Sequence, residues 1–104
     1  METFEIERDD ARPLRFKGEM IATASSKTTD GPGSQRWRVL HLYRTAAGTL
    51  VAERIGRTIW IGERDRHEAQ ACATEAEVVE YLGLGDTAKE IYYQAQIDIS
   101  ESID

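Results

Sequence analysis

The segment that most constrains the fold covers residues 36–62, RWRVLHLYRTAAGTLVAERIGRTIWIG. Short runs of apolar and β-branched residues alternate there with small residues and glycines, which is typical of consecutive strands joined by tight turns. The pattern predicts strands at residues 35–45, 49–56 and 58–61, with a turn at residues 56–57 before the last of them. Strands that follow one another so closely in sequence pair as antiparallel neighbours.

The linker Ala46-Ala47-Gly48 between the first two of these strands fits a three-residue hairpin loop. Glycine is the residue best suited to the left-handed backbone conformation that such a loop requires. If Thr45 faces Thr49, then His41 lies opposite Glu53 across the two strands. A loop shorter by one residue would change every partner, so the hairpin predicts a specific strand register.

The part of the chain before this hairpin predicts one long strand at residues 14–24. Phe16, Met20 and Ala22 are expected on one face of that strand, and Gly18 indicates a bulge or a close approach of another backbone. Residues 1–12 are expected to form a frayed arm or a short edge strand. Residues 25–35 read as a polar surface loop that lacks the Lys-Ser/Thr ending of a phosphate-binding loop.

The part after residue 66 changes from strand to helix. Residues 67–73 fit either structure, and we favour a strand because Thr74 and Glu77 form a capping box that starts a helix directly afterwards. Gly83 ends that helix, and Asp86 is expected to cap a second helix. The second helix carries the clearest amphipathic stripe in the chain, Ala88, Ile91, Tyr92, Ala95 and Ile99. Residues 100–104 are expected to fray.

These elements together predict the α+β class, with a four- to five-stranded antiparallel meander sheet and two C-terminal helices packed on one face. The 104 residues fit one domain, 1–104. No apolar run approaches the roughly 20 residues that span a bilayer, and the acidic first residues do not resemble a signal peptide. Cys72 is the single cysteine, which excludes an internal disulfide. We therefore expect a cytoplasmic protein without membrane contact.

The net charge of −6 is unevenly distributed along the chain. Residues 11–66 carry eleven Lys and Arg against five Asp and Glu, an excess of six positive charges. Residues 68–104 carry one Lys against nine Asp and Glu, an excess of eight negative charges. The two halves either neutralise each other within one molecule or leave a basic face available to an anionic partner.

The predicted sheet carries large apolar side chains on both faces, whereas an antiparallel sheet with one solvated face alternates cleanly. The second row is expected to be covered by the N-terminal arm, by a second copy of the chain or by another protein. Tryptophan, tyrosine and arginine are enriched in protein interfaces. The expected role is therefore a non-enzymatic binding or adaptor module that forms a homodimer or docks on a protein partner. The candidate interface residues, some of which belong to the core instead, are Trp37, Arg38, Leu40, Leu42, Tyr43, Arg44 and Trp60.

Two other functions compete with this interpretation. Single-stranded nucleic acid could bind the basic sheet, with stacking on Trp37 or Trp60 and with phosphate contacts from Arg36, Arg38, Arg44, Arg54 and Arg57. A small hydrolase-like enzyme could use His41 and Glu53 as a general base pair, although no Ser or Cys nucleophile lies nearby in the sequence.

Metal and cofactor chemistry has little support in the sequence. Asp65, His67 and Glu68 form the only compact group of possible ligands around a histidine, and no second His or Cys group completes it. Cys72 lies among alanines, which is typical of a small buried residue. We therefore expect no metal and no cofactor.

Overall fold

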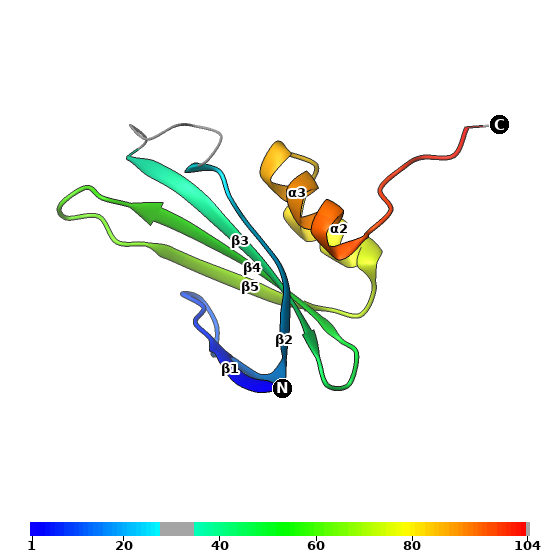
Figure 1. Cartoon of the computed structure of the whole chain (residues 1–104). Helices are drawn as coiled ribbons and strands as arrows, with labels where there is room; N and C mark the ends of the chain where they lie inside the picture. Colours follow the sequence, from blue (N-terminus) through cyan, green and yellow to red (C-terminus); the bar gives the residue numbers. More distant parts are fainter. Residues whose placement is uncertain (28–34, 104) are drawn as a thin grey trace.

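The computed structural model describes residues 1–27 and 35–103. Most of the polar loop predicted at residues 25–35 lies outside the described residues. The described elements are, in chain order, the strands β1 (Glu2–Ile6), β2 (Leu14–Ser25), β3 (Arg36–Thr45), β4 (Leu50–Thr58) and β5 (Arg66–Cys72), followed by the helices α2 (Glu75–Leu82) and α3 (Asp86–Ala95). The strands form one curled antiparallel sheet and the helices follow it, which confirms the predicted α+β class (Figure 1).

The sheet is a simple meander with the strand order β1-β2-β3-β4-β5. The register predicted for the β3–β4 hairpin is confirmed, because His41 pairs with Glu53 and Tyr43 pairs with Val51. Gly48 adopts a φ of 91°, the left-handed conformation expected in the turn. Residues Arg66–Cys72 form a strand, so the strand interpretation of this ambiguous segment is also confirmed.

Both helices pack on one face of the sheet, where they bury the larger of two apolar clusters (Figure 1). Leu42 and Ile91 are fully buried there, and Tyr92 is nearly so, with its hydroxyl donating a hydrogen bond of 2.6 Å to the carbonyl oxygen of Gly83. Each large side chain buried in this way contributes roughly 1.5–3 kcal/mol. This helix-covered face is the main core of the domain.

The opposite face is covered by the chain's own N-terminus, as one of the three predicted alternatives requires. Phe4 on β1 packs against Phe16 and Tyr43, with ring centroids 5.5 and 4.9 Å apart. Beyond β1, the backbone N–H of Asp9 donates to the carbonyl of His67 on β5 at 2.9 Å. The sheet therefore curls until the segment after its first strand meets its last strand, and a second apolar cluster fills the curl.

Two details of the predicted strands are wrong. β4 continues through Gly56 and Arg57 to Thr58, and residues 59–61 form a loop instead of a fourth hairpin strand. A register shift between Met20 and Ala22 in β2 turns Ala22 toward the helices, whereas Phe16 faces the curl. The three residues predicted on one face of this strand are therefore divided between two faces, because a single bulged residue inverts the alternation.

The helix boundaries follow the predicted signals with two differences. Gly83 ends α2 with a φ of 82°, as expected. The cap of α3 is Gly85, and Asp86 is its first helical residue and makes no side-chain capping bond. Gln96 takes a left-handed conformation that ends α3, so Ile97 is buried and Ile99 is exposed. Among residues 1–27 and 35–103, no helix is long and apolar enough to cross a membrane.

Replacing Thr74 by alanine should destabilise the fold by about 1 kcal/mol. The Thr74 hydroxyl oxygen accepts from the N–H of Glu77 at 3.2 Å, and the Glu77 carboxylate accepts from the N–H of Ala73 at 2.7 Å. Urea unfolding followed by circular dichroism measures the loss. Thr74→Ser retains the oxygen and should remain close to the parent protein, and equal losses in both variants would contradict a capping role.

Candidate functional site

Three of the residues predicted to contact a partner belong to the core of the single chain. Leu40 and Leu42 are buried under the helices, and Tyr43 is buried inside the curl. The sequence left open which candidates belong to the core, and these three do, because the helices and β1 already remove them from solvent. Trp37 is half-buried, whereas Arg38, Arg44 and Trp60 are exposed.

Three consecutive exposed apolar side chains lie in the loop after β4. Ile59 is 62% exposed and Trp60 is 49% exposed, and Ile61 is fully exposed. The Arg36 guanidinium lies 5.8 Å from the centre of the Trp60 ring, and Arg64 follows in the same loop with a highly exposed side chain. We call Arg36, Ile59, Trp60, Ile61 and Arg64 the docking rim.

Two carboxylates hold this loop against the sheet. Glu63 accepts hydrogen bonds from Arg36 at 2.6 and 3.0 Å and from the Thr58 hydroxyl at 2.6 Å, and these bonds lower the pKa of its carboxyl to about 2. Asp65 accepts from the N–H of Thr58 at 3.1 Å and from Arg57 at 2.9 Å, and these two bonds lower its pKa. The apolar side chains of the rim are therefore presented by a hydrogen-bonded loop.

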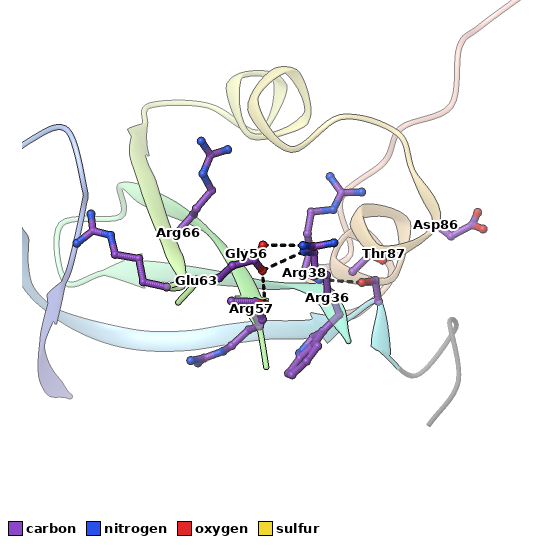
Figure 2. Close-up of a pocket in the computed structure, with 12 residues that line it drawn as sticks. Arg36, Arg38, Gly56, Arg57, Glu63, Arg66, Asp86 and Thr87 are labelled. Carbon is purple, nitrogen blue, oxygen red and sulfur yellow. Dashed lines mark hydrogen bonds and ion pairs between the residues drawn. The ribbon is translucent and has the colours of Figure 1, made fainter. Parts of the chain in front are cut away.

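A cavity of about 730 Å³ lies beside the rim, between the end of the sheet and the start of α3. Five arginines and two carboxylates, Glu63 and Asp86, line it. One of the five, Arg57, forms an ion pair with Asp65, which is not part of the lining. Figure 2 shows the Asp86 side chain directed away from the arginines. We call this cavity the arginine pocket, and its charged and polar lining comprises Ser26, Arg36, Arg38, Arg57, Thr58, Glu63, Arg64, Arg66, Asp86 and Thr87.

Strand register places three residues of the pocket in one row. Arg38 on β3 pairs with Gly56 on β4, and Gly56 pairs with Arg66 on β5. Directly paired residues share a face of the sheet, so the two arginines stand on either side of a position without a side chain (Figure 2). Within residues 1–27 and 35–103, neither guanidinium has a carboxylate within ion-pair distance.

The five arginines predicted to bind nucleic acid do not form one tract. Arg54 is bound by Glu68 at 3.0 Å and by the carbonyl oxygen of Tyr81 at 3.0 Å. Arg57 forms an ion pair with Asp65. Strand alternation places the side chains of Arg57 and Arg38 on opposite faces of the sheet. Arg44 lies at the other end of β3, six residues and up to about 20 Å from Arg38 at the rise of an extended strand.

The predicted pair of His41 and Glu53 does form inside the curl. The His41 Nδ1 lies 2.8 Å from the Glu53 carboxylate, and the Tyr43 hydroxyl donates to the same oxygen at 2.7 Å. Burial alone would raise the pKa of Glu53, but the hydrogen bonds from His41 and Tyr43 outweigh it and lower the pKa. Burial and the neighbouring carboxylate raise the pKa of Tyr43. Neither His41 nor Glu53 lines the arginine pocket.

The possible metal ligands of the sequence do not converge. His67 contacts Glu7 at 3.5 Å, Asp65 binds Arg57, and Glu68 binds Arg54 on the helix-covered face. In the part of the chain that the structure describes, no group of three or more His, Cys, Asp or Glu side chains is placed to hold a metal ion. Cys72 is a buried free thiol in the main core.

Sequence reasoning named Trp60 and Arg38 but missed Gly56, Arg64 and Arg66. Gly56 was interpreted as part of a turn, because glycine more often interrupts a strand than occupies its middle. The sequence does place two arginines, Arg64 and Arg66, two positions apart directly before a predicted strand. In a strand, every second side chain lies on the same face, so this spacing could have indicated a basic face.

Comparison with protein-family models, with curated proteins and with solved structures gives no match to this chain.

Proposed function

We propose that this chain is a non-enzymatic binding module that self-associates, with the docking rim of one copy seated on the acidic helix surface of another. The observation that carries the proposal is the exposure of Ile59, Trp60 and Ile61 in a loop braced by Glu63 and Asp65. Contiguous exposed apolar side chains flanked by arginines match the composition of protein interfaces.

Charge complementarity supports a second copy as the occupant. Exposed apolar side chains occur in the connection between α2 and α3 (Leu84), on α3 (Tyr93) and after α3 (Ile99). The same part of the chain has an excess of acidic residues, of which Glu80, Glu90 and Asp98 are exposed. We call these six residues the acidic helix surface. An apolar surface with negative charges complements an apolar rim with positive charges.

The two surfaces are different, so the contact between copies would be heterologous. Such a contact closes into a ring or continues as a chain, depending on the rotation between copies. Because part of the attraction is between exposed opposite charges, the association should weaken with added salt.

Sedimentation velocity over a roughly hundred-fold range of concentration tests this function. At low salt we expect a concentration-dependent shift to larger species, and at about 0.5 M salt the shift should diminish. Trp60→Ser should weaken association roughly ten-fold, because an aromatic anchor at an interface is commonly worth more than 1 kcal/mol. Glu80→Arg should also weaken association, because Glu80 belongs to the acidic helix surface, on which the docking rim of the other copy is seated.

Met20→Ser is the matched control, because Met20 is exposed but lies on β2 outside both surfaces. It should leave association unchanged. A protein that stays monomeric over the whole range would overturn the proposal. If the protein is monomeric and instead binds a single-stranded oligonucleotide, and Trp60→Ser weakens that binding, the exposed tryptophan would be assigned to nucleic-acid binding and self-association would be rejected.

The enzymatic alternative has weaker support. The buried cluster of His41, Tyr43 and Glu53 satisfies its own hydrogen bonds, and the described residues contain no buried side-chain nitrogen or oxygen without a partner. A general base must reach a proton on a substrate, and these groups face an interior filled by Phe4 and Phe16. The burial of Glu53 and Tyr43 and their hydrogen bonds within the cluster therefore favour a structural role.

A further inference from the structure

We propose that the arginine pocket binds the phosphate group of a small molecule, seated above Gly56 between Arg38 and Arg66. The arginine pocket borders the docking rim and shares Arg36 and Arg64 with it, but Arg38, Gly56 and Arg66 lie outside the rim. A cavity of about 730 Å³ is in the range of pockets that hold a small organic ligand. The proposal therefore concerns a phosphate monoester, with the phosphate as the recognised group.

The row Arg38-Gly56-Arg66 provides the geometry for this recognition. Neighbouring strands lie roughly 4.8 Å apart, so the Cα atoms of the two arginines are about 10 Å apart across Gly56. A guanidinium presents a planar set of N–H donors that matches the oxygens of phosphate. Two such groups on either side of a floor without a side chain can both contact one tetrahedral anion.

The charge of the pocket favours a phosphate over a single carboxylate. Arg36 and Arg57 already neutralise Glu63 and Asp65, whereas Arg38 and Arg66 have no carboxylate within ion-pair distance in residues 1–27 and 35–103. A phosphate monoester carries nearly two negative charges at neutral pH and balances both arginines. The backbone N–H of Arg38 donates to the Ser26 hydroxyl oxygen at 2.8 Å, which holds this position of β3.

A substitution at Gly56 would fill the floor of the arginine pocket and leave all of its charged side chains in place. A Cβ added there would lie 3.5 Å from the Cβ of Arg66, which is an ordinary contact, and Gly56 does not adopt a positive φ. Gly56→Val should therefore fold, since a β-branched residue suits a strand. Its methyl groups would occupy the position that we assign to the phosphate.

The test uses isothermal titration calorimetry of the full chain at low salt with three probes: adenosine 5′-monophosphate, adenosine and inorganic phosphate. We expect adenosine 5′-monophosphate to bind and adenosine not to bind, because only the first carries the phosphate. Binding of inorganic phosphate with similar affinity would identify the free anion as the ligand, and much weaker binding would identify the ester. Equal binding of adenosine and its monophosphate, or no binding of either phosphate probe, would overturn the proposal.

Variants separate this site from a general effect of charge. Arg38→Gln and Gly56→Val should each weaken phosphate binding about ten-fold or more, because a charge-assisted hydrogen-bond pair is lost or blocked. Arg44→Gln removes an exposed arginine from the far end of the same strand and should change the affinity less than about two-fold. Equal losses for Arg38→Gln and Arg44→Gln would contradict a defined site, as would an unchanged affinity in Gly56→Val.

The two functions can fail separately. Trp60→Ser should weaken self-association and leave phosphate binding in place, and Gly56→Ala should do the reverse. Gly56→Ala also serves as the second filled-floor variant if the valine protein does not fold. Thermal unfolding establishes that each variant is folded before titration.

Discussion

Gly18→Ala should lower the free energy of unfolding by about 3 kcal/mol, a large effect for a single added methyl group. A Cβ at residue 18 would overlap the backbone carbonyl of Arg44, and it would lie 2.9 Å from the Cα of Thr45. These are backbone atoms of β3, and they move only if β2 and β3 separate. Because Gly18 also pairs with Glu2, the displacement would extend to β1.

Gly56→Ala provides a matched comparison for this substitution. Gly56 also lies inside a strand, but a Cβ there meets its nearest atom at 3.5 Å. Glycine in a strand interior is less stable than alanine by roughly 0.5–1 kcal/mol, so this variant should equal or exceed the parent protein. Urea unfolding of both variants measures the difference. Similar losses at the two glycines would show that backbone contact with Arg44 is not the cause.

Glu53→Gln should destabilise the protein by about 2–4 kcal/mol at neutral pH. Glu53 is only 6% exposed and receives hydrogen bonds from both His41 and Tyr43. Glutamine has nearly the same shape, and its carbonyl oxygen can still accept both bonds, but it carries no charge to strengthen them. The loss arises because two partners of a buried charge are left weakly bound.

The parent protein and this variant should also differ in their dependence on pH. The folded-state pKa of Glu53 is below its ordinary value of 4.5, because hydrogen bonds from His41 and Tyr43 outweigh the effect of burial. This contribution to stability is therefore complete above the unfolded pKa and is lost as the pH falls through the folded pKa. Unfolding free energies measured between about pH 7 and pH 3 should converge for the parent and Glu53→Gln at the acid end.

Glu68→Gln is the control for this experiment. Glu68 forms an ion pair with Arg54, but its side chain is 53% exposed. An exposed pair contributes roughly 0–1 kcal/mol, so the variant should remain close to the parent at neutral pH. A loss at Glu68 as large as that at Glu53 would contradict the role assigned to the buried cluster.

Local signals in the sequence predicted the order of the elements and part of their register. Gly48 between two alternating runs was enough to pair His41 with Glu53, because turn length and alternation constrain a hairpin independently of the rest of the chain. Thr74 and Glu77 predicted the start of α2 for the same reason. Which candidate residues belong to the core could not be predicted, because burial of Leu40, Leu42 and Tyr43 depends on segments distant in sequence.

Residue patterns along the chain are enough to place strands before helices, to pair consecutive strands, and to put apolar side chains on both sheet faces. What covers each face of the sheet is set by the three-dimensional packing, because it depends on how far the sheet curls. The curl rests on contacts such as the hydrogen bond from Asp9 to His67, and the bulge between Met20 and Ala22 divides β2 between two faces. Alternation and turn residues act over a few positions, whereas curl and coverage arise from the packing of the whole chain.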